Sequence, residues 1–266
     1  MVQTSDAPGA TPAPGGSRAT IRQVGTEQPW AWLAQGWQDL CGAPSVSLVY
    51  GIVFSAAGLA LTGAIWLIDA FYLVLPLAAG FLFVGPILCV GLYDVSRRLG
   101  AGEAVSLGRA LTAWRKNEAQ IALLGLALVL FLMAWMLLAM IIFALFFSDR
   151  LPDPANFISD VFFSRESIPF LIVGTGAGTV LAALVFAISA VSIPMLLDRD
   201  VDVLTAVVTS LRAVRRSPGA MAVWAGLIGL FIGAGLVTAY LGLIVTLPLI
   251  GHAAWHAYKD LVGFPE

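Results

Sequence analysis

Long stretches without charge alternate with short polar segments along the chain. Four apolar stretches are each long enough to cross a membrane, because a bilayer core about 30 Å thick needs about 20 helical residues. They cover residues 46–68, 70–93, 119–147 and 167–197. A fifth stretch, 217–258, has no Asp, Glu, Lys or Arg, and as one helix it would be roughly twice the bilayer thickness. We expect it to fold back near 237–242 into two spans, at about 218–238 and 241–259. The pattern therefore predicts an all-α membrane protein with six transmembrane helices.

Three of the polar connections carry apolar residues at helical spacing. The apolar positions are Trp30, Leu33, Trp37 and Leu40 in the first, Leu107, Leu111 and Trp114 in the second, and Leu204, Val207, Leu211 and Val214 in the third. Asp202 is placed to cap the start of the third segment. Each segment predicts a short amphipathic helix on the cytoplasmic side, which either lies in the headgroup layer or packs as a collar beneath the bundle.

These segments also indicate an internal repeat. A shift of 100 positions lays Leu107 on Val207 and Leu111 on Leu211, and the first segment matches the second after a shift of 74. The chain is thus predicted to contain three parallel units, at about 30–93, 104–197 and 202–260. Each unit would be an amphipathic helix followed by a transmembrane hairpin. Parallel repeats imply a pseudo-symmetry axis along the membrane normal.

The positive charges lie on one side of the predicted spans. Twelve of the fourteen Lys and Arg residues fall in the two terminal segments and in the connections after the second and fourth spans. The opposite side has only Arg150 and Arg165. Because cytoplasmic loops carry an excess of Lys and Arg, we expect both termini to be cytoplasmic.

Composition agrees with a membrane protein. The 266 residues are 59% hydrophobic and 11% charged, whereas soluble domains have about 25% charged residues. Residues 1–29 are rich in Pro, Gly, Ala, Ser and Thr, which predicts a disordered N-terminal tail before a membrane domain at 30–262. No basic tract of the nucleic-acid-binding type is present. Cys41 and Cys89 fall near the cytoplasmic face, where we expect reduced thiols.

Three pieces of the chain resemble a bacterial family of integral membrane proteins. They are "GWQDLCGAPSVSLVYG", "SIPMLLDRDVDVLTAVVTSLRAVRRSP" and "LPLIGHAAWHAYKDLV". The family is the domain of unknown function DUF2189, and the resemblance covers about residues 30–262, with the last piece its most specific part. It implies a multi-pass helical bundle in the bacterial inner membrane, and it implies no reaction.

The predicted spans contain little that could carry chemistry. No Asp, Glu, Lys or Arg lies inside them, while Asp69 and Asp94 fall at span edges. Proton-coupled carriers usually keep an ionisable group at mid-membrane, so this class is disfavoured. The prolines within the spans kink helices and can open substrate sites; they are Pro76, Pro86, Pro194 and Pro248. No nucleophile–base arrangement is visible, and we therefore expect no enzymatic activity and no cofactor.

His252 and His256 are the only two histidines and are spaced to share one helix face. They could hold a metal together, with Asp260, Asp94 or Asp198 as a further ligand. One of them could instead be an axial ligand of haem, with the second axial histidine from another subunit. The third interpretation is structural, because Trp255, Tyr258 and Lys259 beside them are typical of a membrane-interface anchor.

Two function classes follow from these observations. The first is a non-catalytic membrane scaffold or assembly partner, embedded in the lipid bilayer and bound to other membrane proteins or to further copies of itself. The second is a permease-like or lipid-handling protein, which would need a cavity between the proline-kinked spans. Metal or haem binding through His252 and His256 is the third alternative.

Overall fold

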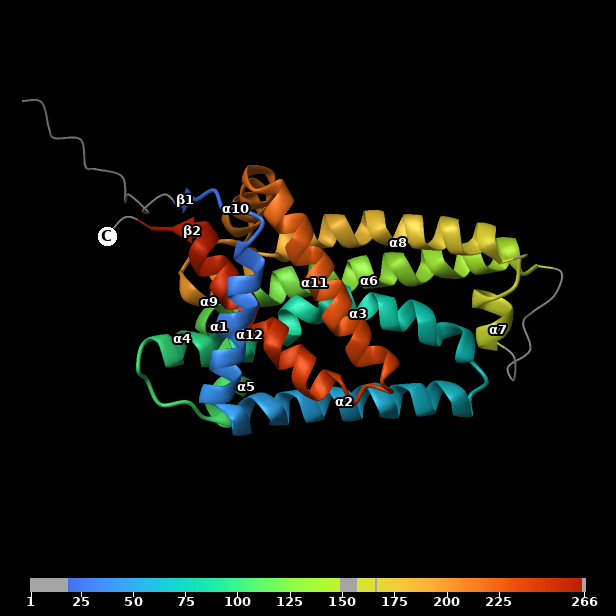
Figure 1. Ribbon diagram of the computed structural model, residues 1–266, viewed down its shortest axis with the longest axis horizontal. Coiled ribbons are helices and arrows are strands. Elements are labelled where there is room, and N and C mark those ends of the chain that lie inside the picture. Colours follow the sequence, from blue (N-terminus) through green and yellow to red (C-terminus); the bar gives the residue numbers. More distant parts are fainter. Residues whose placement is uncertain (1–18, 149–156, 166, 265–266) are drawn as a thin grey trace, which may run out of the picture.

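The computed structural model describes residues 19–148, 157–165 and 167–264, and most of these are helical (Figure 1). The elements in chain order are β1 (Thr20–Ile21), α1 (Gln28–Gly42), α2 (Pro44–Leu67), η1 (Phe71–Leu73), α3 (Val74–Leu88), α4 (Val90–Gly100), α5 (Leu107–Leu111), η2 (Ala113–Asn117), α6 (Glu118–Phe146), α7 (Phe157–Phe162), α8 (Ile168–Ser189), α9 (Ser192–Asp198), α10 (Val203–Arg216), α11 (Pro218–Val237), α12 (Leu243–Leu261) and β2 (Val262–Gly263).

Five helical segments of the described residues are long and apolar enough to cross a membrane. They are Pro44–Leu67, Phe71–Leu88, Ala113–Phe146, Ile168–Asp198 and Pro218–Val237. The protein is therefore an all-α membrane protein with several candidate spans. The expected sixth span, α12, is not among the five, and its second half carries His252, His256, Lys259 and Asp260.

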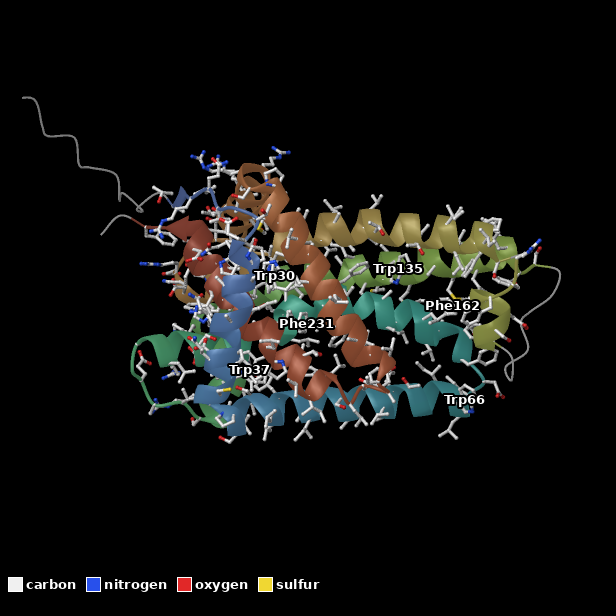
Figure 2. The ribbon with its side chains drawn as sticks, in the orientation of Figure 1. Trp30, Trp37, Trp66, Trp135, Phe162 and Phe231 are labelled. Carbon is white, nitrogen blue, oxygen red and sulfur yellow. The ribbon has the colours of Figure 1, made fainter. Side chains whose placement is uncertain are left out.

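Exposed aromatic side chains mark both ends of the bundle. Figure 2 shows Trp30 and Trp37 on α1 at one end, and Trp66 and Phe162 at the other. Trp and Tyr are enriched at the two membrane–water interfaces, where amphipathic rings sit at headgroup level. This placement fits long helices that run from one interface to the other.

Two of the long apolar runs bend where proline removes a backbone donor. Pro86 precedes the break between α3 and α4 at Cys89, and Pro194 follows the break between α8 and α9. At the second break the Ser210 side chain of α10 takes the place of a backbone hydrogen bond between α8 and α9. Its hydroxyl donates to the Ala187 carbonyl at 2.8 Å and accepts from the Val191 amide at 3.2 Å, so both freed backbone groups are satisfied.

The short helices gather at one end of the bundle, and α7 lies at the opposite end (Figure 1). We call α1, α5, η2, α10 and the β1–β2 pair the collar, and the end of the bundle beside them the collar end. Helix α1 packs on α12, α5 on α4, and α10 on α8 and α9. The predicted cap of the third short helix is confirmed, because the Thr205 amide donates to the Asp202 carboxylate at 2.9 Å.

The collar helices bury faces that differ from the predicted apolar stripes. Helix α1 buries Leu33 and Leu40 as expected, but it also buries Trp32, while Trp30 and Trp37 are exposed. In the other two, Leu107, Val207 and Val214 of the predicted stripes pack half-buried against the core, but the fully buried positions are mainly small residues and several bulky side chains are exposed. Buried are Ala110, Ala113, Ala206, Ser210 and Ala213, and exposed are Leu111, Trp114 and Leu204. Small residues permit close helix contact, which leaves the bulky ones for the membrane interface.

The segment predicted as a disordered N-terminal tail, residues 1–29, is described by the structure only in its second part. Residues 1–18 lie outside the described residues, but 19–29 are ordered on the collar. Strand β1 pairs antiparallel with β2, with Thr20 opposite Gly263, and the Arg22 amide donates to the Leu261 carbonyl at 2.9 Å. Backbone pairing with the chain end supplies the order that this segment's apolar content does not.

Helix α12 lies at the centre of the collar end. Most of its residues are buried, and it contacts α1, α2, α4 and α11. Two glycines allow this close packing. A Cβ on Gly36 would come within 2.7 Å of the Ala253 amide nitrogen, and one on Gly51 within 2.2 Å of the Ile244 carbonyl oxygen. The core is therefore tightest where α1 and α2 cross α12.

Candidate functional site

His252 lies at the centre of a buried hydrogen-bond network. Its side chain is 0% exposed, with Nε2 2.8 Å from the Ser47 hydroxyl and Nδ1 2.7 Å from the Ser96 hydroxyl. The three residues come from α12, α2 and α4. Which ring nitrogen donates and which accepts depends on the tautomer, and in either neutral tautomer both nitrogens have a serine hydroxyl as partner.

His256 lies one turn later and contacts a different partner. Its Nε2 is 2.7 Å from the Asp39 carboxylate of α1, and both side chains are partly exposed. Burial opposes ionisation of Asp39, but hydrogen bonds from His256 and Ser96 prevail and hold the pKa of this carboxyl below its usual value. The network therefore runs from His256 at the surface through Asp39 and Ser96 to His252 and Ser47.

The structure does not bring a metal-ligand set together around the two histidines. Within residues 19–148, 157–165 and 167–264, no group of three His, Cys, Asp or Glu side chains could hold a metal ion. Asp260, expected on the same face, accepts from Gln28 Nε2 at 2.8 Å and Trp32 Nε1 at 2.7 Å. A metal or haem would have to displace these partners, and both alternatives stay predictions that an absorption spectrum and elemental analysis of purified protein would check.

Asp94, the second candidate ligand, is the centre of an ion cluster. Its carboxylate is 1% exposed and accepts from Arg98 Nε at 2.6 Å, Lys116 Nζ at 2.9 Å and Arg97 Nε at 3.0 Å. Both arginines also reach Glu103. Burial of Asp94 opposes its ionisation, but the three cations outweigh this effect and hold its pKa below the usual value. Asp94 therefore joins α4 to η2.

Asp198, the third candidate ligand, also joins two elements. It ends α9 and accepts from the Tyr258 hydroxyl at 2.8 Å and from Lys259 Nζ at 3.3 Å, both on α12. The three carboxylates considered as metal ligands thus each bind a neighbouring helix. These carboxylates hold neighbouring helices together at the collar end.

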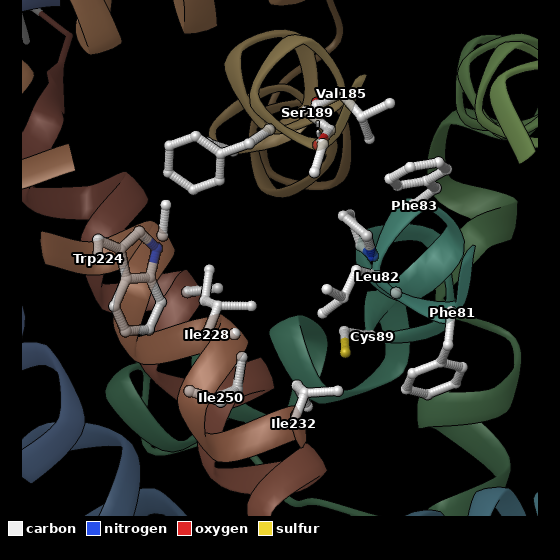
Figure 3. Close-up of a pocket in the computed structure, with 18 of the residues that line it drawn as sticks. Phe81, Leu82, Phe83, Cys89, Val185, Ser189, Trp224, Ile228, Ile232 and Ile250 are labelled. Atoms are coloured by element: carbon white, nitrogen blue, oxygen red, sulfur yellow. Dashed lines mark hydrogen bonds between the residues drawn. The ribbon is translucent and has the colours of Figure 1, made fainter. Parts of the chain in front are cut away.

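An apolar cavity lies between the kinked helices, and the histidine signal gave no hint of it. This cavity A has a volume of about 310 Å³ and is lined by α3, α8, α11 and α12, with Cys89 and Tyr93 at the collar end (Figure 3). Figure 3 shows Trp224, Ile228 and Ile232 of α11 facing Leu82 and Phe83 of α3 across it. Ligand pockets of this size are typically apolar with a few polar groups.

A second apolar cavity continues toward the other end of the bundle. This cavity B has a volume of about 400 Å³ and lies between α3, α6, α7 and α8. Leu82, Phe83, Thr179 and Ala182 border both cavities. Pro86 lines cavity A and Pro76 lines cavity B, so the prolines were the one sequence feature that pointed to this space.

Comparison with known protein families gives a match over the middle of the chain. Residues 73–198 match the model of the family described as "Predicted integral membrane protein (DUF2189)". No curated protein and no solved structure matches the chain. The matched part runs from η1 to the end of α9 and includes the α3 and α8 walls of both cavities, while the histidine segment of α12 lies outside it. The resemblance to DUF2189, a family of predicted integral membrane proteins, is thus confirmed for residues 73–198.

Proposed function

We propose that this chain is a non-catalytic protein of the bacterial cytoplasmic membrane that holds a lipid-like molecule between its spans. The observation that carries the proposal is cavity A, an apolar space of about 310 Å³ between helices of membrane-spanning length. Cavities lined by apolar side chains stay dry and bind apolar molecules. A bilayer supplies such molecules at the highest local concentration.

The α11–α12 hairpin supports a sixth span. The Tyr240 hydroxyl at its tip lies 2.6 Å from the Thr62 hydroxyl, and Thr62 is near the end of α2 away from the collar. The hairpin thus reaches almost as deep as α2 itself. With six spans, both termini and the basic collar face the cytoplasm, as the excess of Lys and Arg favours. A reporter fused after Glu266 is expected to be cytoplasmic, and a periplasmic reporter would reject this orientation.

The packing of the collar supports the three-unit repeat. Helix α1 of the first unit packs on α12 of the third, α5 of the second on α4 of the first, and α10 of the third on α8 and α9 of the second. An aspartate near the end of each unit also binds a residue of another unit, in the same cyclic order. Asp94 binds Lys116 of the next unit, Asp198 binds Lys259, and Asp260 binds Gln28. Three units that each hold the next would close a ring around the membrane normal.

A pair of matched variants on α11 tests the lipid-holding function. Gly229 lines cavity A and a Cβ there meets nothing within 4 Å, whereas Gly226 has the same open space but does not line the cavity. Gly229→Phe is expected to fill the cavity, and Gly226→Phe places the same ring outside it. Native mass spectrometry of protein purified in mild detergent should show a bound lipid in the wild type and in Gly226→Phe, and much less in Gly229→Phe.

Equal lipid retention in the two variants would contradict the proposal. So would a wild-type protein that carries no lipid and binds none when lipid is added back. Stable co-purification with a larger membrane partner in that case would favour the scaffold role that the sequence also allows.

A further inference from the structure

Two aromatic side chains that line cavity A, Trp224 and Tyr93, carry hydrogen-bond donors without a partner among the described residues. The Trp224 indole is 1% exposed and the Tyr93 side chain 3% exposed, and both line the cavity. Neither the indole N–H nor the phenol O–H has a hydrogen bond with any residue that the structure describes. Figure 3 shows the Trp224 nitrogen on the cavity side of its ring. Buried Trp and Tyr usually find a partner for these groups, so two unpaired donors in one cavity point to an acceptor on a ligand.

The rest of the lining defines what that ligand is. Of the other polar side chains around cavity A, the Ser189 hydroxyl already donates to the Val185 carbonyl at 2.7 Å, and the Cys89 thiol is only a weak donor. The Thr179 hydroxyl lies where cavity A meets cavity B, away from the two aromatic donors. No Lys, Arg, His, Asp or Glu lines the cavity. A charged headgroup inside would therefore be buried without a counter-ion, at a cost of several kcal/mol or more. The acceptor has to be neutral, and it has to sit on an apolar body.

The cavity also gives the ligand a direction. Tyr93 lies on α4 at the collar end, and the Trp224 ring packs edge-on against Trp32 of α1. From there cavity A runs along α3 and α8 to the residues that it shares with cavity B, among them Leu82 and Ala182. The polar end of a bound molecule thus lies toward the collar and its apolar tail points toward cavity B.

From these observations we propose that cavity A binds a neutral lipid whose carbonyl oxygen accepts hydrogen bonds from Trp224 and Tyr93. This proposal rests on the proposed lipid-holding function. Acyl esters and long-chain quinones share the required chemistry, namely an uncharged carbonyl acceptor on an apolar chain. The aromatic donors select for that oxygen, and the surrounding aliphatic and aromatic side chains bind the chain.

The test compares probes with and without the carbonyl group. Delipidated protein in detergent is titrated with methyl palmitate, with hexadecane and with a long-chain benzoquinone, and bound probe is measured by native mass spectrometry. The wild type is compared with Tyr93→Phe, Trp224→Phe and the double variant, which remove the donors but keep aromatic rings. The double variant is expected to bind the carbonyl probes about tenfold more weakly, because both hydrogen bonds to the carbonyl oxygen are lost. Hexadecane binding is expected to stay unchanged.

The outcomes separate this proposal from the one on which it rests. If no probe binds the wild type, the lipid-holding function itself is wrong. If hexadecane and methyl palmitate bind equally well and the Phe variants change neither, the cavity holds apolar chains but does not recognise a carbonyl, and the proposal fails. A fall in hexadecane binding together with the carbonyl probes also overturns it, since the variants would then act through packing. The ratio of ester to quinone affinity identifies the source of the carbonyl.

If replacement of Trp224 prevents folding, Tyr93→Phe alone still tests the proposal. It removes one oxygen atom and leaves the ring, so methyl palmitate binding should weaken severalfold while the melting temperature holds. An unchanged affinity in this variant would remove Tyr93 from the site and contradict the proposal.

Discussion

The collar end and the membrane-spanning region of this protein are built on different principles. At the collar end, α12 is mostly buried, and its two histidines and three neighbouring aspartates all have hydrogen-bond or ionic partners. In the spanning region, the buried share of the most apolar window runs from 11% in Phe71–Leu88 to 50% in Ile168–Asp198, and two cavities lie between the helices. The fold is therefore fixed mainly at one end.

The two regions differ because lipid surrounds the spanning helices, whereas water borders the collar end. Lipid tails are as apolar as Leu side chains, so helices within a bilayer gain little free energy from burying leucines against one another. At the collar end, polar groups that lose water must find partners, and a network that satisfies them specifies one arrangement. A loosely packed span is then free to accommodate a ligand. The following predictions, from the largest expected effect to the smallest, test this contrast.

Asp94→Asn is expected to destabilise the protein most. It would leave Arg97, Arg98 and Lys116 around a neutral amide, and loss of one partner in a buried ionic cluster costs about 3–5 kcal/mol. The melting temperature in detergent measures the loss. Glu103→Gln is the control, because Glu103 is exposed and solvent screens its ion pairs, so its loss should change the melting temperature little. Similar losses for the two variants would mean that the buried cluster does not stabilise the collar.

His252→Ala is expected to cost about 3 kcal/mol, because the buried hydroxyls of Ser47 and Ser96 would both lose a partner. His256→Ala should cost about 1 kcal/mol, since His256 is partly exposed and makes one bond, to Asp39. Thermal unfolding of the two variants gives the comparison. A larger loss for His256→Ala would contradict the central position of His252.

Two glycine substitutions compare packing in the two regions directly. Gly36→Ala places a Cβ within 2.7 Å of α12 backbone, and overpacking of this kind costs about 1–3 kcal/mol. Gly229→Ala places the same methyl group in cavity A with nothing within 4 Å, and the higher helix propensity of Ala should stabilise α11 by up to about 1 kcal/mol. Chemical denaturation in detergent measures both. Opposite signs are expected, and equal effects would show that the cavity closes in solution.

Acid below about pH 4 is expected to loosen the collar end with the smallest effect. The pKa values of Asp39 and Asp94 are held below the ordinary value of 3.8, so each carboxylate stabilises the fold above about pH 4. This stabilisation is lost as the pH falls through the folded-state pKa values. Hydrogen exchange across the acid range should therefore show α1 and α4 opening before α6 and α8. Simultaneous opening of all four helices would be evidence against separate regions.

The chain turn between α11 and α12 lies where the sequence placed the fold-back, but its backbone geometry and its contacts could not be predicted. The sequence indicated a fold-back at 237–242 only because the apolar run is too long, and it contains no strong turn signal. In the structure Ala239 and Tyr240 have positive φ angles of 53° and 66°, which is costly for residues with a side chain. Hydrogen bonds from Ser55 to the Tyr240 carbonyl and between Thr62 and the Tyr240 hydroxyl hold the turn. These contacts come from α2, far away in the chain.

The candidate site was also predicted only in part from the sequence. The spacing of His252 and His256 correctly suggested one helix, but it could not show that Ser47, Ser96 and Asp39 from three other helices would occupy their ring nitrogens. The prolines indicated kinks, yet the unpaired donors of Trp224 and Tyr93 had no sequence signal. A tryptophan in an apolar run is ordinary until the facing helices leave its N–H without a partner.

The sequence by itself determined that this is a helical membrane protein, because runs of about 20 apolar residues have no other stable solution in a bilayer. It also determined the short amphipathic helices and the asymmetry of charge along the chain. Only the tertiary structure decided which carboxylate binds which neighbour, that residues 20–22 pair with residues 261–263, and that apolar cavities lie between the kinked helices. These features depend on contacts between residues far apart in sequence, and local pattern carries no record of which distant surfaces will meet.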